Sequence, residues 1–189
     1  MKMIYLDDEQ KLRIYSLPLR QRILREMEKA GRPITAKAIA DRLGITPSAA
    51  QHHIKKLESI GLVEQDHIES INGIQARLLR VADATVSIGQ QLADETSPAR
   101  DAFVEGQVTQ ACRDYQRIVD YARKNNLPQA DTGNDLCTDI VHLTDAEAVE
   151  LRAMLLEYAR QHKQAREGTK PWQLVYLAYD MTLAESAGE

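Results

Sequence analysis

One stretch near the N-terminus, residues 35–63, constrains the fold more than any other part of the chain. Thr35 is a favourable N-cap residue, and Gly44 stands where a helix that starts there would need a left-handed residue to end. Thr46 is a second N-cap residue, and the proline after it suits the first helical position. The spacing predicts two short helices, over 36–43 and 47–60, joined by a tight turn.

Apolar residues recur in both predicted helices at spacings of three and four, so one face of each helix should pack inward. The inward positions are Ala36, Ile39, Ala40 and Leu43 in the first helix, and Ala50, Ile54 and Leu57 in the second. Two helices joined by a short turn containing glycine are typical of the DNA-binding helix-turn-helix unit, whose second helix enters the major groove.

A β-hairpin is predicted directly after the second helix, with strands over 62–71 and 74–81. Asn72-Gly73 is a strong signal for a two-residue turn, which would pair Ile71 with Ile74 and Ile68 with Arg77. This register places Leu62, Ile68, Leu79 and Val81 on the core face. A helix-turn-helix followed by a hairpin is a winged helix. The predicted tip carries no cation, so we expect a weak wing contact, in which Arg77 is the one candidate.

Three runs of sequence resemble the ArsR-type winged-helix transcriptional regulators: PLRQRIL at 18–24, AIADRLGI at 38–45 and HIKKLESIGLV at 53–63. The resemblance covers roughly residues 10–82, under half of the chain. It implies a winged helix-turn-helix that regulates transcription. Metal-sensing members often carry Cys-x-Cys in the first helix of the motif, whereas helix 36–43 has no cysteine. We therefore expect no metal site.

The charge of the chain is divided by segment, although its net charge is −4. Residues 11–80 contain 13 Lys or Arg against 7 Asp or Glu, a net charge of +6, and residues 81–189 have a net charge of −8. A basic segment that coincides with an independent DNA-binding motif favours contact with nucleic acid. Uneven division of surface charge by chance is the alternative.

The outward face of the second helix carries the candidate DNA contacts. We expect Gln51 to pair with adenine, Ser48 and His52 to read base edges, and Lys55 and Lys56 to hold phosphates. The full set of predicted DNA-binding residues is Thr35, Thr46, Ser48, Ala49, Gln51, His52, Lys55, Lys56 and Arg77.

Before this motif, the sequence predicts an edge strand or packed arm over 3–6, a helix capped by Asp7 and Asp8, and a helix over 18–30. Arg20 in the latter helix could serve either a structural role or a phosphate contact. After the hairpin, residues 85–88 are expected to add a third strand.

A long helix is predicted over 98–126, where Ser97 is a good N-cap and Pro98 suits the first position. Its apolar residues are spaced 4, 3, 4, 3, 4, which is a heptad pattern suited to a helix–helix dimer contact. The predicted seam consists of Val104, Val108, Ala111, Tyr115, Ile118 and Ala122. Phe103, Cys112 and Val119 on a flanking face leave open an ordinary amphipathic helix packed on its own domain.

The C-terminal part reads as strand 136–143, helix 145–162 and strand 172–179, a small α/β unit. Thr144 and Glu147 form a capping-box pattern at the start of the helix. The predicted fold class is thus α+β, with a DNA-binding domain at 1–82, a linker at 83–96 and a dimerisation and effector domain at 97–189.

The sequence contains no catalytic or metal-ligating constellation and no cofactor motif, so an enzyme is not expected. No apolar run is long enough to span a membrane and no signal peptide is present, so a cytoplasmic protein is expected. Cys112 and Cys137 are either buried small hydrophobes or a redox-sensitive thiol pair.

The leading hypothesis is a sequence-specific transcriptional regulator, a repressor, that binds operator DNA as a homodimer and responds to an unidentified small effector. The alternative is a winged helix that serves as a protein-interaction module without sequence-specific DNA binding. The +6 segment favours the DNA binder, because interaction modules of this type usually lack a cationic recognition face.

Overall fold

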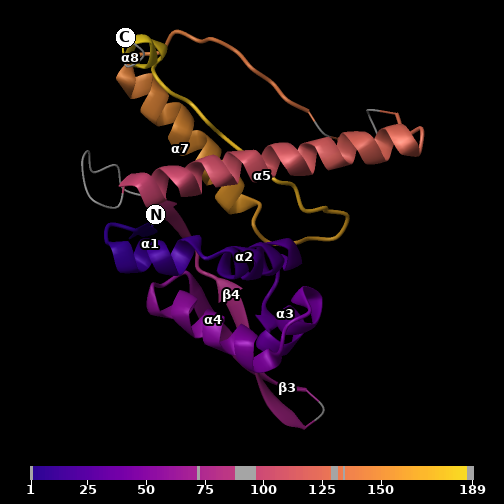
Figure 1. Cartoon of the computed structure of the whole chain (residues 1–189). Helices are drawn as coiled ribbons and strands as arrows, with labels where there is room; N and C mark the ends of the chain where they lie inside the picture. The colour runs from indigo at the N-terminus through magenta and orange to yellow at the C-terminus, as the bar shows by residue number, and fades with distance from the viewer. Residues whose placement is uncertain (1, 72, 88–96, 129–131, 134, 187–189) are drawn as a thin grey trace. The chain divides into compact units, whose positions relative to one another are not determined.

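The computed structural model describes residues 2–71, 73–87, 97–128, 132–133 and 135–186 (Figure 1). The fold is α+β, as predicted. The chain forms two compact units, one of residues 1–103 with 139–171 and the other of residues 104–138 with 172–189. The predicted domain boundaries at 82/83 and 96/97 stay a prediction.

The first unit begins with two helices, α1 (Glu9–Ser16) and α2 (Pro18–Ala30), which match the predicted ones. The Asp8 carboxylate caps α1 by accepting a hydrogen bond from the backbone N–H of Lys11 at 2.7 Å. Proline at the first position of α2 leaves no orphan N–H there. Gly31 ends α2 with a φ of 59°, a left-handed conformation that favours glycine.

The predicted helix-turn-helix is confirmed as α3 (Ala36–Leu43) and α4 (Pro47–Ser59). The hydroxyl oxygens of Thr35 and Thr46 accept hydrogen bonds from the N–H groups of Ala38 and Ala49, at 3.1 and 3.2 Å. Gly44 ends α3 with a φ of 66°. The two threonine caps provide hydrogen-bond acceptors for backbone N–H groups that have no partner within the first turn of a helix.

The end of α4 has the hydrogen-bond pattern of a Schellman motif. The N–H of Leu62 donates to the carbonyl of Leu57 at 3.0 Å, and the N–H of Gly61 donates to the carbonyl of Glu58 at 2.9 Å. Gly61 has a φ of 75°, which the motif requires. The turn leads the chain directly from α4 into the first strand of the hairpin.

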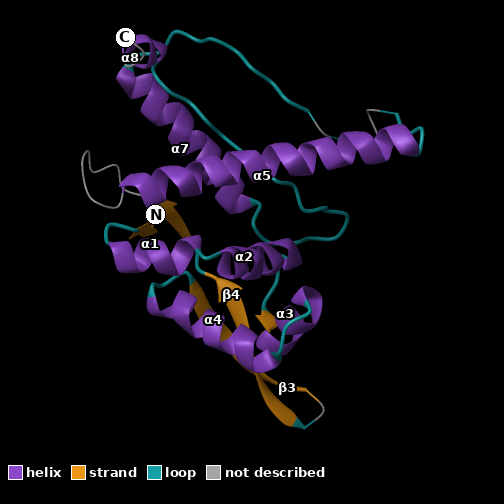
Figure 2. Ribbon diagram, viewed as in Figure 1, coloured by secondary structure: helices purple, strands orange, loops and turns teal. Residues whose placement is uncertain are grey.

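A three-stranded antiparallel sheet follows in the order β2 (Ile34–Thr35), β4 (Ile74–Val81), β3 (Val63–Ile71) (Figure 2). Ile71 pairs with Ile74 and Ile68 pairs with Arg77, so the predicted register is confirmed. A bulge interrupts β3 between Gln65 and His67. The β3–β4 hairpin is the wing of the winged helix.

The prediction that Ile68 lies on the core face is wrong, because its side chain is 54% exposed. The far end of the β3–β4 hairpin extends beyond the helices (Figure 2). Ile68 belongs to β3 and is not among the buried residues of the hydrophobic core. Leu62 and Leu79, nearer the helices, are buried as predicted.

A second, two-stranded sheet pairs β1 (Lys2–Tyr5) in parallel with β5 (Ala84–Ser87). The predicted third strand therefore exists within the described residues, but it pairs with the N-terminal strand and not with the hairpin. Residue 88 lies outside the described residues. This pairing connects the segment that follows the wing to the start of the chain.

The hydrophobic core of the first unit is aliphatic and gathers around α2, α3 and α4. The largest side chains without exposed surface in this core include Ile23, Ile39 and Leu57. The predicted inward positions Ala40, Ala50 and Ile54 are also buried. This core fixes the orientation of α4 against the rest of the first unit.

The long helix is α5 (Ser97–Lys124). Two residues of the predicted seam, Val104 and Ile118, are each 43% exposed, and the other four are partly buried. Phe103 on the flanking face packs its ring against Tyr15, with ring centroids 5.2 Å apart. The dimer seam stays a prediction.

Two further helices lie in the described part of the chain, α7 (Asp145–Gln161) and α8 (Met181–Ser186). The predicted capping box of α7 is present: the Thr144 hydroxyl accepts from the N–H of Glu147, and the Glu147 carboxylate accepts from the N–H of Thr144 at 2.7 Å. No described residue of α7 is buried.

The predicted strands over 136–143 and 172–179 are absent, because neither segment belongs to a helix or a β-ladder of the described chain. A strand requires a neighbour for its backbone groups, and apolar alternation alone does not supply one. The expectation that Cys112 and Cys137 are buried is also wrong: both are exposed, and no disulfide bond links them. Among the described helices, none is long and apolar enough to cross a membrane.

Candidate nucleic-acid interface

The exposed side of α4 presents a contiguous set of polar and cationic side chains. Ser48, Gln51, His52, Lys55 and Lys56 are all exposed, and Ala49 is partly buried. Because Ala50, Ile54 and Leu57 are buried on the opposite side, α4 cannot rotate without opening the core. The packing therefore holds the five polar side chains outward.

Some of the predicted contact groups already have partners within the protein. The hydroxyls of Thr35 and Thr46 cap α3 and α4, and the Ser48 hydroxyl lies 3.2 Å from that of Thr46. These hydrogen bonds fix the orientation of the three hydroxyl groups at the N-termini of α3 and α4.

A groove with a volume of about 290 Å³ lies between the start of α3, the side of α4 and strand β4. Four of the predicted residues line it: Thr35, Gln51, Lys55 and Arg77. Lys37 and Glu58 also line this groove, and neither is among the predicted contacts. Lys37 is a cation in the first turn of α3, and this position in the sequence could have identified it as a candidate contact.

Arg77, the predicted wing contact, is held by two neighbours. Its guanidinium lies 2.8 Å from a carboxylate oxygen of Glu58 on α4 and donates from Nε to the side-chain oxygen of Gln65 at 2.7 Å. Arg80 is similarly paired with Glu64 at 2.6 Å and Asp66 at 3.2 Å. Both arginines of the hairpin therefore have their charge balanced inside the protein, and Arg77 joins the wing to α4.

We expect Arg77→Ala to lower the free energy of unfolding by at most about 1 kcal/mol, because ion pairs this exposed are screened by water. The Arg77 and Glu58 side chains are 44% and 23% exposed. Urea denaturation of the full chain, followed by far-UV circular dichroism, measures the change. A loss of several kcal/mol would show that the Arg77–Glu58 pair holds the wing in place.

Arg20, for which two roles were open, has a structural one. Its guanidinium donates to the carbonyl of Ile14 at 3.0 Å and to that of Arg13 at 3.5 Å, near the end of α1. Cations near the last carbonyls of a helix stabilise its C-terminus. Arg20 therefore connects α2 to α1.

His53 of α4 is partly buried and lies near this arginine. Burial lowers the pKa of His53, and the charges of Arg20 and His52 lower it further. The imidazole is therefore neutral at pH 7 and adds no charge for a phosphate. Among the described residues, no group of three or more His, Cys, Asp or Glu side chains could hold a metal ion.

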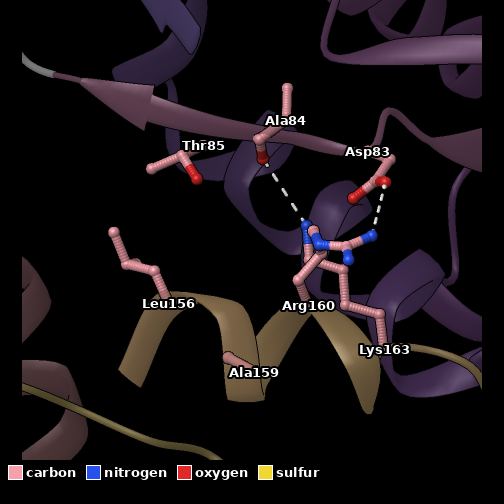
Figure 3. Close-up of a pocket in the computed structure, with 7 residues that line it drawn as sticks. All are labelled: Asp83, Ala84, Thr85, Leu156, Ala159, Arg160 and Lys163. Atoms are coloured by element: carbon pink, nitrogen blue, oxygen red, sulfur yellow. Dashed lines mark hydrogen bonds and ion pairs between the residues drawn. The ribbon is translucent and has the colours of Figure 1, made fainter. Parts of the chain in front are cut away.

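A second pocket, with a volume of about 180 Å³, lies between β5 and α7 in the first unit (Figure 3). The Arg160 guanidinium points toward the Asp83 carboxylate at 3.6 Å, and the Lys163 ammonium points toward the carbonyl of Ala84 at 3.5 Å. Hydrogen bonds from Arg160, and then from Gln161, lower the pKa of Glu157 to about 2. Arg160 is thus balanced by two carboxylates, which makes this pocket a poor site for an anion.

Taken together, the first unit contains a winged helix-turn-helix whose second helix presents an exposed cationic and polar face. Residues 15–66 match the family model of a helix-turn-helix domain. The chain has no significant match among curated proteins. The N-terminal part of this chain is thus a helix-turn-helix domain, of the kind found in DNA-binding regulators.

Proposed function

We propose that this protein is a sequence-specific transcriptional regulator of the ArsR type, a repressor that binds operator DNA as a homodimer. The observation that carries the proposal is the exposed face of α4, fixed by three buried residues on its opposite side. The match of residues 15–66 to a helix-turn-helix domain supports the same class. The net charge of +6 over residues 11–80 supports an anionic partner.

In this proposal α4 lies in the major groove. The Gln51 amide can donate to and accept from an adenine edge, whereas Ser48 and His52 read neighbouring edges. Lys55 and Lys56 contact phosphates, which position the helix without reading sequence. Because Arg77 is held by Glu58 and Gln65, we assign it a smaller share of the binding than α4.

The homodimer of this proposal uses the seam of α5, from Val104 to Ala122. A two-fold dimer would place two α4 helices in successive major grooves, roughly 34–36 Å apart. Residues 1–82 would bind DNA, and residues 97–189 would dimerise and bind a small effector. An effector that prefers one spacing of the two α4 helices would shift the population between DNA-competent and incompetent states.

Lys56→Ala should weaken binding to all DNA sequences by a similar factor and reduce the salt slope by about one, because one phosphate contact is lost. Fluorescence anisotropy on a labelled duplex from the promoter of its own gene, at several salt concentrations, measures both effects. Arg117→Ala on α5 is the control: it also removes one exposed cation, from a residue outside the proposed interface.

Comparison of the two variants distinguishes a phosphate contact made by Lys56 from a general effect of removing one positive charge. If Arg117→Ala changes the salt slope as much as Lys56→Ala, then Lys56 holds no phosphate. If the wild-type chain shifts no genomic fragment at physiological salt, the winged helix is a protein-interaction module instead.

A further inference from the structure

Glu58 is the only acidic residue of α4, and it lies on the side of the helix that carries the proposed DNA contacts. Residues 51, 55 and 58 are four and three positions apart, so they share one face of α4. Gln51, Lys55 and Glu58 all line the groove between α3, α4 and β4. Among the described residues that line this groove, Glu58 is the only one with a carboxylate. A negative charge therefore lies on the face that a DNA backbone would approach.

This position is unfavourable for a carboxylate in two ways. The C-terminal end of a helix carries a partial negative charge, which disfavours an acidic side chain in the last turn. Glu58 is the last residue but one of α4. The phosphates of a bound duplex would also repel it, because charges act on one another over roughly 8 Å at physiological salt. Neither the stability of α4 nor attraction to DNA accounts for a glutamate here.

Arg77 of β4 balances the Glu58 carboxylate. Its Nη2 lies 2.8 Å from Oε1 of Glu58, and its Nε donates to the side-chain oxygen of Gln65 at 2.7 Å. A guanidinium binds a phosphate with the same N–H groups that bind a carboxylate. Glu58 therefore occupies, on Arg77, donors that a DNA phosphate could use.

The Arg77–Glu58 pair has more influence on an approaching polyanion than on the fold. The two side chains are 44% and 23% exposed, so water screens their attraction and the pair adds little stability. A phosphate that binds Arg77 must displace Glu58, and it then lies close to the carboxylate that it has displaced. Both effects oppose binding of any duplex, whatever its sequence.

We propose that Glu58 limits the sequence-independent part of DNA binding, because its carboxylate takes the place of a DNA phosphate on Arg77. The base contacts of α4 are left unchanged, so Glu58 lowers the affinity for all duplexes by a similar factor. This inference rests on the proposed function, of which it needs only the placement of α4 on DNA. It does not depend on the homodimer or on an effector.

Glu58→Gln nearly keeps the size of the side chain and removes its charge. It should lower the dissociation constant for every duplex by roughly three- to tenfold and steepen the salt slope by about one, because Arg77 becomes one more phosphate contact. Fluorescence anisotropy of the full chain at several salt concentrations, on the promoter duplex and on one of scrambled sequence, measures both effects. Loss of a purely structural contact would not tighten binding. Unchanged or weaker binding would overturn the proposal.

The same substitution in an Arg77→Ala background tests whether the gain depends on Arg77. Without Arg77, Glu58→Gln releases no cation, so its effect on the salt slope should be much smaller. The gain in affinity should shrink as well, since the two residues are in contact and their effects are coupled. A salt slope that steepens equally in both backgrounds would contradict competition between Glu58 and DNA for Arg77.

Glu64→Gln is the matched control, because it removes the same charge from another ion pair of the hairpin. Glu64 lies 2.6 Å from Arg80, which also keeps Asp66 at 3.2 Å. Arg80 follows Arg77 by three residues in β4, so the two arginines point to opposite faces of the sheet. We expect Glu64→Gln to change the dissociation constant by at most about twofold. An equal gain in Glu58→Gln and Glu64→Gln would show a general effect of net charge and overturn the role of Glu58.

The same titrations distinguish failure of this role from failure of the proposed function. If the wild-type chain binds DNA and Glu58→Gln leaves the affinity unchanged, the role of Glu58 is wrong and the regulator remains. If neither the wild-type chain nor Glu58→Gln binds any duplex, both are wrong. An unchanged far-UV circular dichroism spectrum shows that each variant folds.

Discussion

Leu57→Ala is expected to lower the free energy of unfolding by about 2–5 kcal/mol, the usual cost of truncating a buried leucine. Leu57 has no exposed surface and lies in the core where α4 meets the rest of the first unit. Its carbonyl also accepts the hydrogen bond from Leu62 that ends α4. Urea denaturation of the full chain, followed by far-UV circular dichroism, measures the change.

Ile68→Ala serves as the control for this experiment, because it removes similar apolar atoms from a side chain that is 54% exposed. We expect it to change the free energy of unfolding by no more than about 0.5 kcal/mol. Similar losses in the two variants would mean that α4 is not packed on this core. The outward face of α4 would then have no fixed orientation.

Gln51→Ala is expected to reduce discrimination between operator variants by about 1–3 kcal/mol at a single base position, because a bidentate contact to one base edge is lost. Gln51 is exposed on α4 and lines the groove beside β4. Competition binding with a set of duplexes, each altered at one base pair, measures the change position by position.

Lys56→Ala is the natural comparison, since it should weaken all the duplexes alike. If Gln51→Ala also weakens every duplex by the same factor, Gln51 reads no base. The assignment of roles on α4 would then be wrong, although DNA binding itself could remain.

The helix-turn-helix could be predicted closely from the sequence because its determinants are local. Thr35, Gly44, Thr46 and the proline after it each act on a helix end within a few residues. The pairing of Ile68 with Arg77 followed in the same way from the two-residue turn. Local rules also located α2, from Pro18 to Ala30.

Side-chain partners from distant parts of the chain could not be predicted. Arg77 was expected to be available for DNA, but Glu58, which is 19 residues away, and Gln65 hold it. The exposure of Ile68 depends on how far the helices cover the hairpin. The alternation of apolar residues in β3 does not contain this information. The pairing of β5 with β1 joins residues about 80 positions apart.

The strands predicted near the C-terminus failed for a different reason. Alternation over 136–143 and 172–179 describes what a strand would look like, but a strand forms only with a neighbour. Within one copy the described residues supply none.

Selection of bound duplexes from a random DNA library by the full-length protein, at physiological salt, tests the central claim most directly. The account predicts enrichment of one motif with two-fold symmetry, whose half-sites are about one helical turn apart. It also predicts that Gln51→Ala relaxes one position in each half-site. Recovery of DNA without any enriched motif would contradict sequence-specific recognition by α4.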